Sequence, residues 1–389
     1  MWRDSDPVGL SVAVVHPYLN RGGGAERVCL GVIKALVSGG FRVSLYTLDR
    51  VDWRFLEERL GSLTRPHEEA WLFERLPIRG EHSLEFYTSA LFPCLLLNLR
   101  AEAAHDLILN TYGDLGALAD ISYINAVPAR LYHLYPALNP VYKRIASRLY
   151  DLNLKGLERL FGRGLILTNS KFMHILLRKW VGCGSLVVYP PVDIDRFRQE
   201  SMEDREDLVV TVSRLRRGKH LELVPKVAKM VGGGEFVIFG LADQASKGSM
   251  AALRRTIGDM GLEGRVRLLV NQPLEKIRAT LSKAKVYLHT QPLEAFGISV
   301  VEAMASGCVP VVPRLGGPWS DILEMRMGFY GFCYSSPEEA SKRIKGILED
   351  EGMWREISFR ARSRSRDFTP SRFESRIRRI VKGLYEGRI

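Results

Sequence analysis

The feature that most restricts the fold is an alternation between short apolar runs rich in β-branched residues and longer stretches with helical periodicity. Strands of a parallel sheet that is covered on both faces read as continuous apolar runs, each followed by a helix. Such runs cover residues 10–16, 41–47, 106–110, 121–125, 165–169, 186–190, 207–213, 235–240, 265–270, 285–290 and 308–313. The pattern predicts an α/β protein with two Rossmann-like, doubly wound parallel sheets.

The two sets of strands are separated by PPVDIDRFRQESMEDRED, a segment led by two prolines, rich in charge and poor in apolar periodicity. Such a composition is typical of a linker. We therefore predict a first domain over residues 1–190, a linker over 191–206 and a second domain over 207–366. The helical pattern that follows Pro370 is long for a tail, and residues 367–389 are predicted to cross back to the first domain.

The net charge of +12 is unevenly distributed, since residues 130–179 carry ten basic side chains against two acidic ones. Such an excess indicates anionic partners: nucleotide phosphates, lipid diphosphates or an acidic membrane surface. No zinc-finger, RNP-type or helix-turn-helix signature supports nucleic acid. Residues 131–164 interleave Leu, Tyr and Phe with Lys and Arg, which suits an anionic membrane surface; an ordinary helix with a solvated basic side explains the pattern equally well.

The five cysteines are scattered and lie in apolar surroundings, so we interpret them as reduced, as in cytosolic proteins. The longest apolar run, residues 89–99, is interrupted by Pro93 and Asn98 and is shorter than the roughly 20 residues needed to span a bilayer. The opening MWRDSDPVGL is too polar for a signal peptide. We therefore expect a soluble or peripheral protein.

The first motif with chemical content is HPYLNRGGGAERV, residues 16–28. It follows a predicted strand and opens a predicted helix that runs to about Ser38. Glycines before a helix allow the backbone to approach an anion closely, with free N–H groups and the positive end of the helix dipole directed at it. A tight turn between strand and helix is the alternative.

The second motif is SRLRRGKH, residues 213–220, which lies directly after a predicted strand. Arg214 and Lys219 are therefore expected at the carboxyl end of that strand, where open α/β sheets bind ligands. A planar guanidinium and a compact ammonium together suit a diphosphate. A solvated basic loop is the alternative.

The third motif is QPLEAFGISVVEAMASG, residues 291–307, in which Glu294 precedes a predicted helix and Glu302 lies within it. The backbone N–H groups of Phe296, Gly297 and Ile298 are expected at the helix start, where they lack intrahelical partners and can bind an anion. Carboxylates accept hydroxyl groups. A nucleotide sugar has phosphates for the helix start and hydroxyls for both carboxylates. Alternatively, Glu294 complements the helix dipole and Glu302 forms a local salt bridge.

We predict no metal and no other cofactor. The sequence Asp193-Ile194-Asp195 resembles a D-x-D metal motif but lies in the predicted linker, where a turn explains it. Four histidines share no spacing typical of metal ligands: His16, His105, His133 and His289.

The segment EAFGISVVEAMASG resembles the E-x7-E motif of glycosyltransferase family 4, and Arg214 with Lys219 matches the donor-phosphate pair of that family. TNSKF and YPPVDIDRF are similar to its segments before the linker. The resemblance implies a GT-B fold, with two Rossmann-like domains facing each other across a cleft, and a retaining, metal-independent hexosyl transfer. Within the family, HPYLNRGGGAERV and LGGPWSDIL are most similar to the α-1,2-mannosyltransferases that extend dolichol-linked oligosaccharides in N-glycan assembly.

The resemblance also implies roles for individual residues. Glu294 is expected to hold the sugar hydroxyls and Glu302 the ribose hydroxyls. The implied catalytic residues are Arg214, Lys219 and Glu294, and the implied donor-binding residues are Gly23, Gly24, Phe296, Gly297, Ile298 and Glu302. Candidate contacts to the acceptor or the sugar are His16, Tyr112 and Asn125, the last standing where family members commonly carry a histidine.

The resemblance thus implies transfer of a hexose, with mannose from GDP-mannose favoured, onto a polyprenyl- or dolichyl-diphosphate-linked glycan. It implies a cytoplasmic protein that is peripheral on the cytosolic face of a membrane. A UDP-sugar donor, or a soluble or different lipid acceptor, remains an alternative within the family. Outside it, the same scaffold suits a nucleotide-sugar epimerase or a non-catalytic nucleotide-sugar-binding module.

Overall fold

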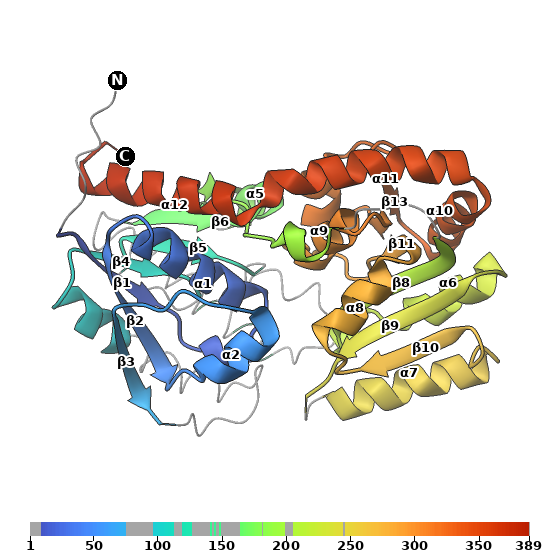
Figure 1. Cartoon of the computed structure of the whole chain (residues 1–389), viewed down its shortest axis with the longest axis horizontal. Helices are drawn as coiled ribbons and strands as arrows, with labels where there is room; N and C mark the ends of the chain where they lie inside the picture. Colours follow the sequence, from blue (N-terminus) through green and yellow to red (C-terminus); the bar gives the residue numbers. More distant parts are fainter. Residues whose placement is uncertain are drawn as a thin grey trace. The chain divides into compact units, whose positions relative to one another are not determined.

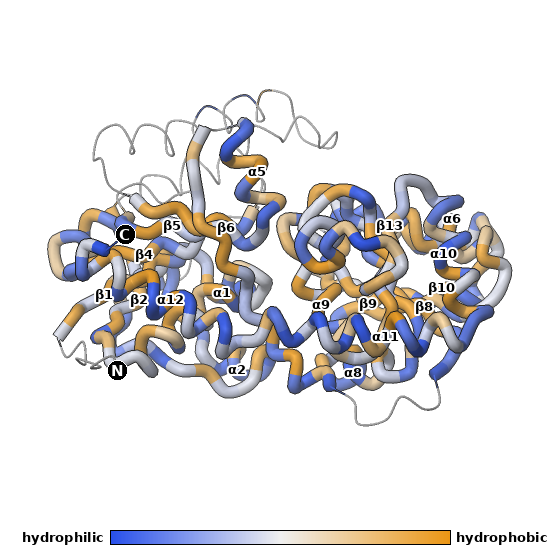
Figure 2. Tube along the Cα trace, turned by 90° about the horizontal axis from the view of Figure 1, so that it is seen from above, coloured by the Kyte–Doolittle hydropathy of each residue, from blue (hydrophilic) through white to orange (hydrophobic). Residues whose placement is uncertain are grey.

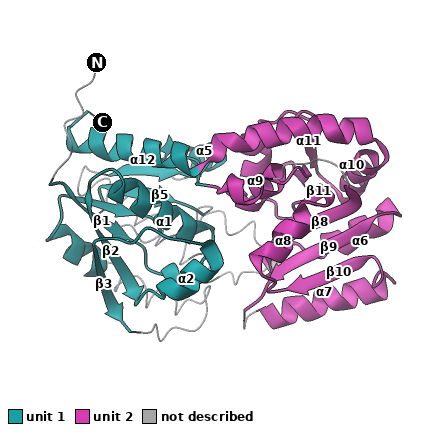
Figure 3. Ribbon diagram, in the orientation of Figure 1, with its two compact units in different colours: residues 1–191, 370–389 teal, residues 192–369 magenta. Residues whose placement is uncertain are grey.

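The computed structural model describes residues 9–74, 96–112, 119–126, 164–180, 182–198, 205–243 and 246–388, together with 141, 144 and 148. The chain divides into two compact units (Figures 1 and 3). Unit 1 consists of residues 1–191 and 370–389, and unit 2 consists of residues 192–369. The described strands of each unit form one parallel sheet, which confirms the predicted α/β class with two doubly wound sheets.

The sheet of unit 1 has the order β3-β2-β1-β4-β5-β6-β7. The winding direction therefore reverses between β1 and β4. The strands are β1 Ser11–Val15, β2 Arg42–Asp49, β3 Glu68–Phe73, β4 Leu107–Asn110, β5 Ile121–Ile124, β6 Leu165–Thr168 and β7 Leu186–Val187. The helices are α1 Gly24–Val37, α2 Trp53–Leu60, α5 Lys171–Trp180 and α12 Pro370–Tyr385, with a short 3-10 turn over Leu19–Arg21.

The core of unit 1 lies on both faces of its sheet. Val12 and Val14 of β1 belong to one apolar cluster, whereas Ala13 and Val15 belong to another, because successive side chains of a strand point to opposite faces. Burial on both faces explains why this strand reads as a continuous apolar run.

Helix α12 packs on α1 within unit 1. A Cβ on Gly31 of α1 would lie 2.9 Å from Pro191 Cγ and 3.0 Å from Phe373 Cε1 of α12, so this glycine allows the helices to approach closely. An ion pair of 3.1 Å joins Lys34 Nζ to Glu374 Oε1. The helical pattern after Pro370 is thus part of the unit that the first half of the chain forms.

The sheet of unit 2 has the order β10-β9-β8-β11-β12-β13, with its reversal between β8 and β11. The strands are β8 Glu206–Arg214, β9 Glu235–Leu241, β10 Val266–Val270, β11 Ala284–Leu288, β12 Val309–Pro313 and β13 Phe332–Tyr334. The helices are α6 Leu223–Val231, α7 Lys247–Asp259, α8 Leu274–Leu281, α9 Ile298–Ala305, α10 Pro337–Glu349 and α11 Glu351–Ser365. Shorter turns cover Ile194–Arg196, Arg217–Lys219, Pro318–Ile322 and Arg366–Phe368.

The segment that we predicted as a linker begins inside unit 2. The N–H of Val192 donates to Phe368 O at 2.8 Å, and the side chains of Ile194 and Phe197 are buried. The division between the units falls between residues 191 and 192 and between residues 369 and 370.

In the described part of the chain, no helix is both long enough and apolar enough to cross a membrane. Figure 2 colours β5 and β6 mostly as hydrophobic, whereas α5 and α12 carry hydrophilic and hydrophobic residues together. Most of the basic stretch 131–164 lies outside the described residues. Four cysteines are buried free thiols: Cys29, Cys183, Cys308 and Cys333.

Candidate functional site

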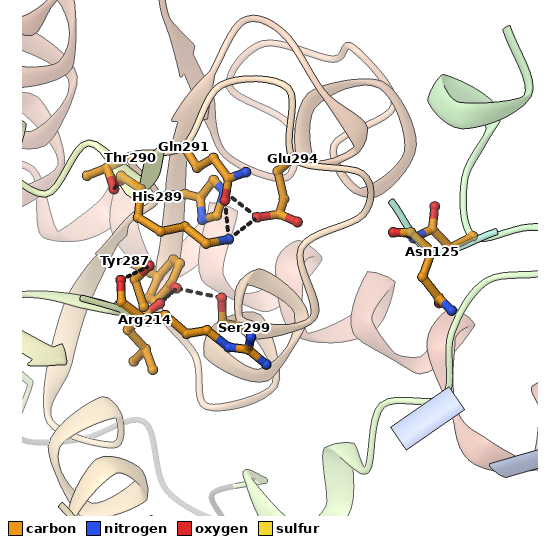
Figure 4. Close-up of polar contacts among 12 residues, drawn as sticks. Asn125, Arg214, Tyr287, His289, Thr290, Gln291, Glu294 and Ser299 are labelled. Carbon is orange, nitrogen blue, oxygen red and sulfur yellow. Dashed lines mark hydrogen bonds and ion pairs between the residues drawn. The ribbon is translucent and has the colours of Figure 1, made fainter. Parts of the chain in front are cut away.

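Unit 2 brings two of the predicted motifs together at the reversal point of its sheet. Strands β8 and β11 are neighbours there, and the carboxyl end of such a pair is where doubly wound sheets bind ligands. Arg214 ends β8 and Lys219 follows in the next loop, while the loop after β11 carries Glu294. Residues about 75 positions apart in the sequence therefore lie side by side (Figure 4).

The backbone around Glu294 is fixed by the segment after β12. The N–H of Gly317 donates to Glu294 O at 2.8 Å, and Leu293 N–H donates to Leu315 O at 3.2 Å. Glu294 also forms an isolated parallel bridge with Gly316. A Cβ on Gly317 would lie 2.3 Å from Ala295 O, so the two segments are in close contact. The sequence did not reveal this support, although the pair Gly316-Gly317 indicates a close approach of backbones.

Lys219 forms an ion pair with Glu294, with 3.1 Å between Nζ and Oε2. Its ammonium also donates to Gln291 Oε1, and its carbonyl accepts from Thr290 Oγ1 at 2.6 Å. Burial is the largest single influence and raises the pKa of Glu294, but Lys219, His289 and the backbone N–H of Ala295 together lower that pKa below the usual value. The carboxylate is therefore ionised at neutral pH and able to accept hydroxyl groups.

His289, whose spacing from the other histidines is not typical of a metal ligand, belongs to the same cluster (Figure 4). Its side chain is 9% exposed, and its Nε2 lies 3.9 Å from Glu294 Oε2. Burial and the charge of Lys219 lower the pKa of His289 to about 4, against the opposing effect of Glu294. The ring is therefore neutral at pH 7. The sequence feature that indicates His289 as a site residue is its place directly after a predicted buried strand, in the run KVYLHT.

Helix α9 starts where we predicted. It begins at Ile298, and Gly297 before it is left-handed, with φ of 101°, a conformation that favours glycine. The first N–H groups of the helix lack intrahelical acceptors and form an anion-binding terminus. Ser299 in the first turn is fixed by Tyr287 Oη, 2.8 Å from its Oγ. Phe296 packs edge-on against Phe368, with ring centroids 5.2 Å apart.

Glu302 lies in the second turn of α9 and is 8% exposed. Arg214 contributes a second cation to this end of the sheet, and Figure 4 shows its side chain directed toward Ser299. Two cations, an anion-binding helix start and two carboxylates are thus gathered on one unit. This arrangement can stabilise a diphosphate and accept several hydroxyl groups.

The candidate residues of unit 1 also meet at a reversal point, between β1 and β4. His16 follows β1, and its Nδ1 lies 2.8 Å from Thr111 Oγ1 after β4. The rings of His16 and Tyr112 meet edge-on, with centroids 5.6 Å apart. Asn125 after β5 donates from Nδ2 to Thr111 O at 2.7 Å. Thr111 therefore joins the three candidates His16, Tyr112 and Asn125.

The glycine segment of unit 1 differs from our prediction of free N–H groups. Helix α1 begins at Gly24, but the N–H of Gly23 donates to Glu26 Oε2 at 2.8 Å, so this donor is occupied. Glu26 also lies 4.0 Å from His16 Nε2. Burial opposes a charge on His16, yet Cys29 and Glu26 together raise its pKa to about 9. The N–H of Gly23 is occupied because of a capping arrangement, in which a Glu in the first turn of a helix reaches back to the residue before the helix.

No group of three or more His, Cys, Asp or Glu side chains within the described ranges is placed to hold a metal ion.

Comparison with known proteins identifies unit 2. Residues 193–364 match the family model described as "Glycosyl transferases group 1". Unit 2 belongs to the group 1 glycosyl transferases. The prediction that the chain is a glycosyltransferase is therefore confirmed.

Several named proteins are similar to this glycosyltransferase. It is 27% identical to a Dictyostelium discoideum protein over 264 residues, which cover 63% of this chain and 51% of that protein. It is 25% identical to a human protein over 429 aligned positions, covering 96% of this chain and 87% of the relative. Both relatives are named GDP-Man:Man(3)GlcNAc(2)-PP-Dol alpha-1,2-mannosyltransferase. The match thus spans about half the length of the Dictyostelium protein.

Solved structures share the fold of this glycosyltransferase. HepE of Anabaena, solved with UDP and glucose, is 18% identical with a TM-score of 0.71, and the match covers 96% of this chain and 100% of HepE. Sucrose-phosphate synthase of Thermosynechococcus elongatus is 16% identical with a TM-score of 0.78, covering 97% and 100% of the two chains. These neighbours confirm the predicted GT-B fold class.

Proposed function

We propose that the chain transfers mannose from GDP-mannose to a polyprenyl- or dolichyl-diphosphate-linked glycan. The names of the relatives, which specify a GDP-mannose donor and a dolichyl-diphosphate-linked acceptor, support the choice of substrates. The cluster at the reversal point of unit 2 is the observation that carries the proposal. An ion pair joins Lys219 to Glu294 there, and backbone hydrogen bonds fix the segment that carries Glu294 and leads into α9.

The departing diphosphate gains negative charge as the glycosidic bond breaks. In our proposal Arg214, Lys219 and the N–H groups of Gly297 and Ile298 stabilise this charge. Preorganised donors of this kind act without reorganising during the reaction, and removal of one typically costs about 100- to 1,000-fold in rate. The same groups supply charge stabilisation that a metal ion would otherwise provide, so we propose a metal-independent reaction.

The two carboxylates accept hydroxyl groups. Glu294, kept ionised by Lys219, holds the hydroxyls of the transferred sugar, and Glu302 of α9 holds those of the ribose. The acceptor hydroxyl attacks from the face that the diphosphate leaves, so the anomeric configuration is retained. In unit 1, we assign the surroundings of His16, Tyr112 and Asn125 to binding of glycan hydroxyls.

We further propose that the protein acts at the cytosolic face of a membrane, as a peripheral protein. A lipid-linked acceptor requires access to a bilayer, and the ten basic side chains between residues 130 and 179, against two acidic ones, favour an anionic surface. Co-sedimentation with phosphatidylserine vesicles at low salt tests this part, and equal recovery with neutral vesicles would contradict it.

The test of the proposal is transfer of radiolabelled mannose from GDP-mannose to a dolichyl-diphosphate-linked oligosaccharide, with EDTA present. We expect product whose α-linkage is established by NMR, and no product from UDP-glucose. A requirement for added divalent metal would refute metal independence, and a β-linked product would refute retention.

Two arginines of one loop provide a matched pair of variants. Arg214→Ala should reduce kcat by about 100-fold or more. Arg216→Ala should retain activity, because Arg216 forms an ion pair with Asp243 outside the proposed site. Equal activity of both variants would exclude the phosphate role of Arg214.

A further inference from the structure

The side chain of His289 has a chemical capacity that the contacts around it do not use. Its backbone is fixed on both sides, since its N–H donates to Val311 O at 2.9 Å and its carbonyl accepts from Tyr334 Oη at 2.7 Å. The ring is nine-tenths buried. In the described residues, its Nε2 has no hydrogen-bond partner. A buried polar atom without a partner is costly and calls for an explanation.

The direction of this nitrogen suggests its partner. Nε2 lies 3.9 Å from Glu294 Oε2, about 1 Å beyond hydrogen-bond distance. The same carboxylate oxygen accepts a hydrogen bond from the ammonium of Lys219, with 3.1 Å between Nζ and Oε2. Figure 4 shows His289, Gln291 and Glu294 pointing toward one another. Both Lys219 and His289 therefore approach one oxygen of Glu294.

The proposed reaction gives Lys219 a second anion to bind. A diphosphate beside Lys219 carries more charge than one carboxylate and competes with Glu294 for the ammonium. If the ammonium moves to the diphosphate while the sugar hydroxyls engage Glu294, the partly buried carboxylate loses its cationic donor and keeps the backbone N–H of Ala295. A partly buried charge with so few donors is unfavourable. A small side-chain shift would then bring Glu294 to His289, whose position is held by Val311 and Tyr334.

We propose that His289 is a positioning residue that replaces Lys219 as the hydrogen-bond donor to Glu294 when the diphosphate and the sugar of the donor are bound together. A neutral imidazole donates from one nitrogen, so it holds the carboxylate without adding a cation that would compete for the phosphates. Glu294 then keeps its remaining lone pairs for the sugar hydroxyls. This inference rests on the proposed function, because the exchange requires a diphosphate and a sugar at the same site.

The test compares GDP with GDP-mannose, because the exchange affects the sugar and not the nucleotide. Isothermal titration calorimetry gives the Kd of each ligand for wild type, His289→Phe and His289→Gln, all in the full chain. We expect His289→Phe to bind GDP as wild type does. Its preference for GDP-mannose, which is the Kd for GDP divided by the Kd for GDP-mannose, should fall about tenfold, the effect of one lost hydrogen bond to a charged group. His289→Gln, whose amide can donate, should retain the preference.

An unchanged preference in His289→Phe would overturn the inference, and so would an equal loss of affinity for both ligands, which a general structural role would cause. If wild type binds neither ligand, the proposed function itself fails.

A second measurement does not depend on the folding of the Phe variant. In wild type with 15N-labelled histidine, GDP-mannose should produce a protected, downfield Nε2–H signal of His289. The signal should be absent with GDP alone and absent in Glu294→Gln. No such signal with GDP-mannose would refute the exchange.

Discussion

Substitution of Gly317 by Ala tests whether the segment after β12 positions Glu294. The backbone of Gly317 has φ of −55° and ψ of −36°, which alanine adopts without strain, so the effect comes from packing alone. The added Cβ would lie 2.3 Å from Ala295 O and 2.8 Å from Phe296 Cα. Because both contacts are backbone atoms, one of the two segments has to move.

The expected cost is about 3 kcal/mol, the upper end of the range for overpacking, because no flexible side chain can give way. For a unit of this size that cost corresponds to a Tm lower by about 6–12 °C. Differential scanning calorimetry measures the shift, and the ligand titrations show whether the preference for GDP-mannose is also reduced, as displacement of Glu294 requires.

Gly264→Ala is the matched control, since a Cβ there has nothing within 4 Å and the change should stay within about 0.5 kcal/mol. If Gly317→Ala has the same Tm as Gly264→Ala and keeps the preference for GDP-mannose over GDP, the close contact does not position Glu294.

Two further predictions concern the stability of unit 2. Arg205→Met should lower the free energy of unfolding, measured in urea, by about 2–3 kcal/mol. The reason is that the guanidinium of Arg205 donates to the carbonyls of Leu281, Ala284 and Ser306. A variant as stable as wild type would show that water replaces these donors at no cost. His289 should make stability depend on pH, since the unfolded ring gains a proton below 6.5 that the folded ring gains only at about 4. The contribution of the neutral His289 ring to the free energy of unfolding is present above pH 6.5 and is lost as the pH falls to about 4. Between pH 7 and pH 4, the free energy of unfolding should therefore fall by about 3 kcal/mol more in wild type than in His289→Gln. Parallel curves of stability against pH would refute this.

Most of the strands that the sequence predicts are buried on both faces. All eleven predicted runs contain a strand of the structure, whereas β3 and β13 were not predicted. Strand β3, EEAWLF, is partly exposed at the edge of its sheet, so it lacks a continuous apolar run. Strand β13 has three residues, too few for a periodic signal. Edge position and shortness alone are not the reason, because β7 has two residues and β10 lies at a sheet edge, and both were predicted from the longer apolar runs around them.

The candidate site could be predicted as a set of residues but not as a set of contacts. The motifs pointed to Arg214, Lys219, Glu294 and Glu302, because each chemical type follows a strand or starts a helix. The ion pair between Lys219 and Glu294 depends on β8 lying beside β11, an order that no local pattern contains. His289 became relevant for the same reason.

Local chemistry could have corrected two other predictions. The N–H of Gly23 is occupied by Glu26, and a Glu in the first turn of a predicted helix is a known signature of such a cap. In the segment after Pro191, the apolar residues Val192, Ile194 and Phe197 are buried. Their spacing was hidden among the charged residues that suggested a linker.

The return of α12 to unit 1 has a consequence for how the protein is made. Residues 192–369 are inserted between two parts of unit 1, so a nascent chain finishes unit 2 before it contains α12. Until then Gly31 and its neighbours on α1 lack Phe373, which packs on them in the finished protein. Unit 1 therefore has to keep an apolar face of α1 uncovered until the ribosome has delivered α12.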